Sequence, residues 1–371
     1  MIYLDNAATS FPKPPCVLKG TAKFIKKECG NSGRSSHELA MITSKLIYES
    51  REAIADFLGI SDAERVVFTQ NATHALNLAI KTTITENSHV LISEFEHNAV
   101  LRPLHAISTK KNISYSIFAT TGNLEENIEC LIRDNTKYII CSLVSNVTGK
   151  EIPLKLLSDI SKKHGLSLIL DASQALGHID VDLKEQNCNI LCSAGHKALF
   201  GIQGVGFAAF IDNEARETVF EGGSGSDSFN LDMPKKLPER FEAGTLSSPA
   251  IVSLLHGIKF IEKIGLEEIK CKIGDIENRY VEILTNSKKC VLNGYGNGII
   301  SFNIKNVSSE AVASNLNDYG ICVRGGFHCS PLAHKSIGTT DSGTVRISLS
   351  YMNSIKEADK FYKALKCITA K

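Results

Sequence analysis

A lysine and an aspartate each follow a predicted buried strand, and their types suit a pyridine cofactor. Lys197 lies in the small-residue turn after the apolar run Ile190–Ser193, and Asp171 ends the run Ser167–Asp171. An amine walled by apolar neighbours loses hydration, so its ammonium form is disfavoured and it can attack a carbonyl. A carboxylate at a neighbouring strand end could keep a pyridine nitrogen protonated while the lysine holds the aldehyde as a Schiff base. Taken alone, Lys197 would more simply be a surface lysine in a loop, and the preceding Asp171 is what favours the cofactor role.

A cysteine and two arginines form a second group of reactive residues. Cys329 lies in a loop bounded by glycine and proline, with Arg324 and His328 close in sequence. Cationic neighbours favour the thiolate of a cysteine, and the thiolate is the nucleophile. Arg346 follows on a predicted strand, where its planar guanidinium could bind the carboxylate of an amino acid in a bidentate manner. An internal salt bridge is the alternative role for this arginine.

Other predicted strand ends carry polar residues that could complete such a site. One strand leads into a capped helix, whose free N–H groups and dipole favour a phosphate. A histidine after the next strand could stack on a planar cofactor, and amides farther on could bind a substrate or cofactor oxygen. Each of these residues is also compatible with an ordinary turn. The candidates are Thr73, His74, His97, Asn146 and Gln174, with Ser193 and His196 beside the lysine.

Strands and helices alternate between residues 65 and 210, which predicts an α/β fold with a mostly parallel, seven-stranded sheet. Ligands bind beyond the carboxyl ends of the strands in such sheets, where the candidate residues lie. A smaller α+β domain is predicted to follow, with strands Ile299–Ile304 and Val345–Leu349. The predicted strands of the sheet are Val66–Thr69, His89–Ser93, Ser114–Phe118, Tyr138–Leu143, Ser167–Asp171, Ile190–Ser193 and Val205–Phe210. Predicted helices are Glu38–Leu58, Thr73–Thr83, Asn98–Ser108, Leu124–Arg133, Leu154–His164, Pro249–Ile264, Glu267–Ser287 and Ser354–Ile368.

Composition excludes several classes of function. The 371 residues carry a net charge of +1 with dispersed charges, which argues against a nucleic-acid or membrane partner. The 11 cysteines are scattered and form no C-x-x-C pair, so neither disulfides nor a metal site is expected. We expect a cytoplasmic protein, because the N-terminus lacks the features of a signal peptide and no apolar run is long enough to span a membrane.

Several motifs in the same order resemble the cysteine desulfurase and selenocysteine lyase family. These enzymes belong to the class V aminotransferase superfamily and to the fold-type I pyridoxal-phosphate enzymes. The matching stretches are the opening Tyr3–Thr9, the Asp171 and Lys197 turns, Arg240–Thr245, and the loop Arg324–Cys329 followed by Val345–Ser348. The short loop between Cys329 and Arg346 is similar to the group II branch.

The resemblance implies a homodimeric enzyme that uses pyridoxal 5'-phosphate to convert L-cysteine to L-alanine. Lys197 would then hold the cofactor and Asp171 its ring nitrogen, while Cys329 takes the sulfur as a persulfide. His97 would stack on the ring and assist proton transfer. The phosphate would be bound by Thr73, His74, Ser193 or His196, and Thr245 of the other subunit, with Gln174 also on the cofactor; Arg346, Asn146 and Arg324 would bind the substrate.

Residues 16–254 are expected to form the large cofactor-binding domain. Residues 1–15 and 255–371 would form the small domain with the cysteine loop. One departure is Ala194, which replaces the serine or threonine that the family usually has three residues before the lysine, so the phosphate contacts could be rearranged. The alternatives are a selenocysteine lyase, a cystine or cysteine C–S lyase, a class V aminotransferase on the same scaffold, or a non-catalytic scaffold. A sulfur-acceptor protein is a possible partner.

Overall fold

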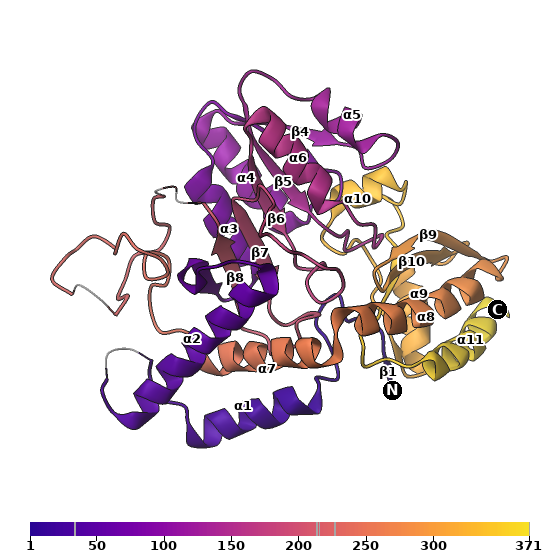
Figure 1. The fold of residues 1–371 in the computed structure, drawn as a ribbon. Helices are drawn as coiled ribbons and strands as arrows, with labels where there is room; N and C mark the ends of the chain where they lie inside the picture. The colour runs from indigo at the N-terminus through magenta and orange to yellow at the C-terminus, as the bar shows by residue number, and fades with distance from the viewer. Residues whose placement is uncertain (33–34, 213, 215, 226–227, 371) are drawn as a thin grey trace.

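A seven-stranded sheet forms the centre of the larger of two lobes in the computed structural model, which describes residues 1–32, 35–212, 214, 216–225 and 228–370 (Figure 1). The strands follow the order β2-β8-β7-β6-β5-β3-β4. Strand β8 runs antiparallel to both of its neighbours, β2 and β7, and the remaining pairs of this sheet are parallel, so the prediction of a mostly parallel sheet is confirmed. The bounds are β2 Val66–Thr69, β3 His89–Ser93, β4 Ser114–Phe118, β5 Thr136–Ser142, β6 Ser167–Asp171, β7 Ile190–Ala194 and β8 Gly206–Phe210.

Helices cover both faces of this sheet, because its central strands are apolar on both sides. Val90 and Ile92 pack with α3 and α4, whereas Leu91 points to the opposite core, with α2, α6 and α7. This alternation follows from the two-residue period of a strand. The helices of the larger lobe are α1 Pro15–Lys27, α2 Glu38–Leu58, α3 Ala72–Thr83, α4 Asn98–Lys111, α5 Leu124–Glu129, α6 Leu154–His164 and α7 Ser248–Ile264, with the 3₁₀ turn η1 Ala63–Arg65.

The smaller lobe is built on a three-stranded antiparallel sheet in the order β12-β10-β9. Helix α7 leads out of the larger lobe into α8, and both chain ends lie with the smaller lobe (Figure 1). The N-terminal strand β1 pairs with β11 in parallel. The bounds are β1 Ile2–Tyr3, α8 Leu266–Thr285, β9 Cys290–Gly296, β10 Ile299–Ile304, α9 Ser309–Asp318, β11 Ile321–Cys322, α10 Pro331–Ser336, β12 Val345–Ser348 and α11 Ile355–Ala370. Within the described ranges, no helix combines the length and the hydropathy needed to cross a membrane.

The predicted elements are found with small shifts at their ends. The largest shift is in α5, which ends at Glu129 instead of Arg133. Several short or irregular elements were not predicted, among them β9, whose side chains are mostly half-buried and which contains two glycines, and the short helix α9. In both segments the spacing of apolar residues is too irregular to predict a strand or a helix from the local sequence.

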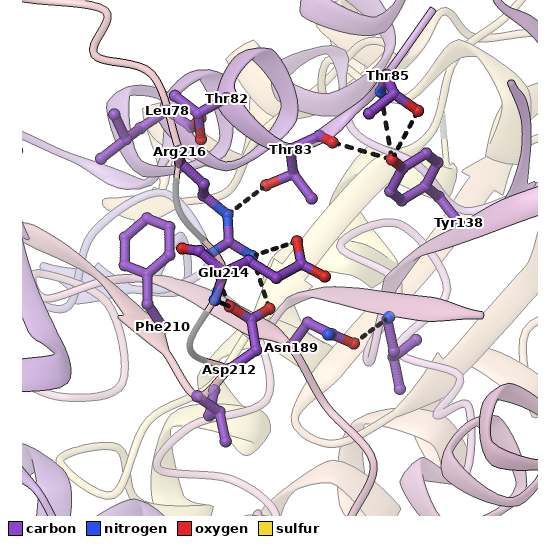
Figure 2. Close-up of polar contacts among 12 residues, drawn as sticks. Leu78, Thr82, Thr83, Thr85, Tyr138, Asn189, Phe210, Asp212, Glu214 and Arg216 are labelled. Carbon is purple, nitrogen blue, oxygen red and sulfur yellow. Dashed lines mark hydrogen bonds and ion pairs between the residues drawn. The ribbon is translucent and has the colours of Figure 1, made fainter. Parts of the chain in front are cut away.

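Polar contacts tie the chain beyond β8 to the end of the sheet where the parallel strands begin (Figure 2). Arg216 donates from Nε to Thr83 Oγ1 at 3.0 Å, and its two terminal nitrogens pair with the Asp212 carboxylate, each at 2.6 Å. Tyr138 OH donates to the Thr83 carbonyl at 3.0 Å. These contacts join α3, β5 and β8 at the edge of the sheet remote from the carboxyl ends of the parallel strands.

Candidate active site

A cavity of about 240 Å³ lies at the carboxyl ends of β5, β6 and β7, where the two lobes meet. The larger lobe contributes the turns that follow these strands. The N-terminal arm contributes Ala7 and Ala8, and the smaller lobe contributes two arginines. The predicted site residues that line this cavity are Thr73, His97, Asn146, Asp171, Gln174, His196, Lys197, Arg324 and Arg346.

Lys197 lies in a hydrogen-bonded turn directly after β7. Its carbonyl accepts from Phe200 N at 2.9 Å, and Gly201 N donates to the Gly195 carbonyl at 2.9 Å. Burial lowers the pKa of the Lys197 amine to about 8, with Asp171 opposing the shift and the arginines of the cavity adding to it. The expectation of a disfavoured ammonium group is therefore confirmed: about a tenth of the amine is uncharged near pH 7, far more than for an ordinary lysine, and this fraction can act as a nucleophile or base.

Asp171 is the last residue of β6 and shares this cavity with Lys197. Ser173 N donates to its Oδ1 at 2.9 Å, which fixes the carboxylate at the strand end. Its strand neighbours across the sheet are Ser142 and Cys192. The central placement of the strand therefore holds this carboxyl group buried and fixed beside the lysine.

His97 caps α4 and faces the cavity as a neutral ring. Its Nδ1 accepts from Ala99 N at 3.0 Å, so the ring proton resides on Nε2. Burial lowers the pKa of this histidine to about 4, which keeps the ring uncharged at neutral pH. A neutral planar ring in a cavity wall can stack on an aromatic ligand and donate from Nε2.

Two guanidinium groups give the cavity an anion-binding side. Arg346 is 2 % exposed; its Nη2 donates to Asp5 Oδ1 at 2.9 Å and its Nη1 to the Asn146 carbonyl at 3.0 Å. Its Nε is buried and has no hydrogen-bond partner among the described residues. Arg324 lies beside it through paired backbone hydrogen bonds. Arg346 therefore forms the internal salt bridge that was the alternative role and also lines the cavity. Its unpaired Nε suits a bound carboxylate.

The N-terminus of α3 also lines the cavity. Asn71 Oδ1 accepts from His74 N at 2.9 Å, and Ala72 and Thr73 line the cavity from the first helical turn. First-turn N–H groups have no acceptor within their own helix and favour an anion. His196 Nδ1 is buried without a partner among the described residues, and burial lowers the pKa of His196 to about 4. The first turn of α3 and His196 therefore offer dipolar and neutral contacts that fit a phosphate.

Three predicted phosphate ligands lie away from the cavity, and their roles stay predictions. His74 packs edge-on against Phe220, and its Nδ1 accepts from Gln70 N at 3.4 Å. Ser193 points to the other face of β7 and donates to the Ala172 carbonyl at 3.4 Å, while Ala194 lines the cavity. Thr245 lines a separate, larger cavity of about 920 Å³ beside α2.

Cys329 lies next to the cavity and does not line it. Its exposed side chain lines an adjoining depression of about 340 Å³ that shares Thr73, His97 and Ala99 with the cavity. The thiol and Lys197 are therefore on two sides of a common wall.

The loop that carries Cys329 is held beside the cavity by hydrogen bonds. His328 and Cys329 have φ values of +50° and +59°, which residues other than glycine rarely adopt. Asn98 N donates to the Cys329 carbonyl and Asn146 Nδ2 to the His328 carbonyl, both at 2.8 Å, while Ser330 Oγ donates to Asn146 Oδ1 at 2.6 Å. Asn146 therefore holds the cysteine loop with both ends of its amide.

Several residues at the site were missed by the sequence analysis. Asp5 pairs with Arg346, and Ser173 Oγ is a buried hydroxyl on the cavity without a partner among the described residues. Glu96 is completely buried and accepts from Ser142 N at 2.8 Å and Ser142 Oγ at 2.9 Å. Only Asp5 had a usable signal, as the one charged residue of the Tyr3–Thr9 stretch.

Comparison with known proteins gives a consistent set of relatives. The sequence profile of the aminotransferase class-V family matches residues 2–361. The chain is 30% identical to a probable cysteine desulfurase of Pyrococcus abyssi, covering 98% of this chain and 93% of that protein. It is also 30% identical to a cysteine desulfurase of Salmonella agona, covering 98% and 92%. The solved apo structure of a cysteine desulfurase from Thermococcus onnurineus NA1 superposes with a TM-score of 0.91 at 29% identity, covering 99% and 94%.

Proposed function

Because the chain belongs to the class-V aminotransferase family and to the cysteine desulfurases within it, we propose that it converts L-cysteine to L-alanine and transfers the sulfur to Cys329. The observation that carries this proposal is the single cavity shared by Lys197, Asp171 and Arg346. It combines an amine of lowered pKa, a fixed carboxylate and a guanidinium with a free donor. An amino acid and a pyridine aldehyde need these three groups.

The residues of the cavity fit pyridoxal 5'-phosphate. The unpaired buried atoms His196 Nδ1, Ser173 Oγ and Arg346 Nε all belong to residues that line the cavity, which indicates a polar ligand there. Lys197 would hold the aldehyde, Asp171 the ring nitrogen, and the first turn of α3 with Thr73 the phosphate. When bound, this cofactor supplies an electron sink that stabilises negative charge at the substrate α-carbon.

The chain's own residues would bind the substrate and move its proton. Arg346 and Arg324 bind the carboxylate of L-cysteine, with Asp5 holding Arg346 in the required orientation. Lys197 Nζ takes the proton from the α-carbon, which its lowered pKa favours. His97 and Gln174 would contact the cofactor from two different strand ends, since they follow β3 and β6 respectively.

Cys329 would carry out the sulfur transfer from its loop. Its thiolate attacks the substrate sulfur, forming an S–S bond while the substrate C–S bond breaks. The electron pair of that bond remains with the β-carbon, which takes up a proton, and Lys197 Nζ returns a proton to the α-carbon to give alanine. Access from the adjoining depression requires the loop to move its side chain past the wall formed by Thr73 and His97.

We further propose that the enzyme acts as a homodimer in the cytoplasm and passes its sulfur to an acceptor protein. Thr245 on the separate 920 Å³ cavity supports a contribution to the partner's site. The free cysteines support a reducing compartment. We also propose residues 16–254 as the cofactor-binding domain, with 1–15 and 255–371 as the domain that carries Arg346 and Cys329.

The experiment is product analysis with L-cysteine and a reductant. The wild-type protein is expected to release alanine and sulfide in equal amounts. Cys329→Ser should abolish sulfide formation, while Cys271→Ser, at another exposed cysteine, should leave it unchanged. Keto-acid product in place of alanine would indicate an aminotransferase, and sulfide release by Cys329→Ser at the wild-type rate would exclude Cys329 as the acceptor.

A further inference from the structure

The backbone carbonyl directly before the catalytic lysine is the meeting point of four hydrogen-bond donors. The carbonyl of His196 accepts from Ser10 N at 3.2 Å, Thr9 Oγ1 at 3.1 Å and Lys13 Nζ at 2.8 Å, and the Ser10 hydroxyl lies within donor distance of it, at 3.2 Å. A carbonyl oxygen has two lone pairs, so this is a dense set of donors for one acceptor. All four donors come from the N-terminal arm, far away in the sequence.

Lys13 is the only charged donor of the four. Its ammonium is partly buried, and burial lowers the pKa of this lysine to about 8, so it remains mostly charged at neutral pH. A charged donor forms stronger hydrogen bonds than a neutral one, and its contact with the carbonyl is the shortest of the set. Lys13 is not among the residues that line the cavity and therefore acts on the site through the backbone.

The contacts also form a directed relay to Lys197 itself. Lys13 Nζ donates to Ser10 Oγ at 2.8 Å, which leaves the hydroxyl proton of Ser10 free to point elsewhere. Ser10 Oγ lies 2.8 Å from the Lys197 carbonyl and 3.2 Å from the His196 carbonyl, so the shorter contact receives this proton. The carbonyls on both sides of the Lys197 backbone N–Cα unit are thus held by one ammonium group.

We propose that Lys13 is a positioning residue that fixes the turn carrying Lys197. This role rests on the proposed function of Lys197 and adds a residue that touches neither substrate nor cofactor. The turn is otherwise closed by two local backbone hydrogen bonds, Phe200 N to Lys197 O and Gly201 N to Gly195 O. A partly buried cation on the His196 carbonyl restricts the peptide plane that precedes the Lys197 side chain, and the reaction is sensitive to the placement of that side chain.

The kinetic test compares Lys13→Met, Lys13→Arg and the control Lys19→Met, which makes the same change at an exposed lysine of α1. Lys13→Met is expected to lower kcat at least about tenfold, because an error of about 1 Å in placement costs up to about a hundredfold. KM for L-cysteine should stay within about threefold, since the arginines that bind the carboxylate are untouched. Lys13→Arg keeps the charge and should recover most of the loss, and Lys19→Met should match the wild type.

Amide hydrogen exchange of the cofactor-free protein is the second readout. The amides of Phe200 and Gly201 close the turn, so Lys13→Met should speed their exchange several-fold while Lys19→Met does not. Ser10→Ala breaks the relay but keeps the ammonium, and it should also speed this exchange, which covers the case that Lys13→Met fails to fold.

Three results would overturn the role of Lys13. They are a kcat of Lys13→Met within about twofold of the wild type, no recovery in Lys13→Arg, and unchanged exchange of the two amides in the folded variants. If the wild-type protein proves inactive on L-cysteine, the exchange data still decide whether Lys13 fixes the turn, so the two proposals fail separately.

Discussion

Replacing Glu96 by glutamine should change how the stability of this protein depends on pH. Glu96 is completely buried directly before His97, and its carboxyl group accepts from Ser93 Oγ, Ser142 N and Ser142 Oγ. Ser142 lines the cavity, so this carboxyl joins the turn after β3 to the end of β5. Burial raises the pKa of Glu96 to about 7, despite the hydrogen bonds that favour the carboxylate.

The sign and size of the effect follow from this pKa. A carboxyl whose pKa is higher in the folded state releases a proton on unfolding between its unfolded pKa and its folded pKa. The free energy of unfolding therefore falls as the pH rises from about 4.5 to about 7. One pKa unit corresponds to about 1.4 kcal/mol, so the full loss across this window is about 3 kcal/mol. Glu96→Gln removes the ionisable group and with it this loss.

The assay is urea unfolding of the cofactor-free protein between about pH 5 and about pH 8, followed by circular dichroism. Stability of Glu96→Gln relative to the wild type should rise by about 2–3 kcal/mol across this range, because the other titrating groups cancel in the difference. Glu52→Gln, at an exposed position of α2, is the matched control and should show no such trend. A difference between Glu96→Gln and the wild type that is independent of pH would refute the reasoning.

Three further predictions test the site and its support. Arg346→Lys loses the planar fork and the free Nε, so KM for L-cysteine should rise about tenfold to a hundredfold in steady-state kinetics; an unchanged KM would show that the carboxylate binds elsewhere. Lys197→Ala should remove the visible absorbance band of protein loaded with pyridoxal 5'-phosphate, and a retained band would place the aldehyde on another amine. Arg51→Met leaves the buried carboxylate of Glu242 unpaired, so chemical denaturation should show a loss of about 3–5 kcal/mol; a loss below about 1 kcal/mol would show that this pair does not hold the segment before Thr245.

The local part of this fold and site could be predicted from the sequence. The central strands are short apolar runs with polar residues at their ends, and this pattern places Asp171 and Lys197 at one edge of a parallel sheet without knowledge of the tertiary structure. Periodicity within a single segment contains this information. The ammonium of Lys197 is disfavoured for the same reason, because the turn follows a buried strand.

The contacts between distant segments could not be predicted. Asp5 and Arg346 meet through the pairing of the N-terminal arm with the smaller lobe, and no local pattern predicts that pairing. The prediction of Ser193 as a phosphate ligand depended on where β7 ends. The strand ends at Ala194, so Ala194 faces the cavity and Ser193 the opposite side. A shift of one residue along a strand reverses the face of a side chain, and strand ends are the least certain part of a sequence-based assignment.

The most direct test of the central claim is a single turnover of cofactor-loaded protein with L-cysteine in the absence of reductant. If Lys197, Asp171 and Cys329 serve one reaction, each active site should form one alanine, and peptide mass spectrometry should find one added sulfur atom on Cys329. Alanine formation with the sulfur on another cysteine, or with Cys329 unmodified, would contradict the account.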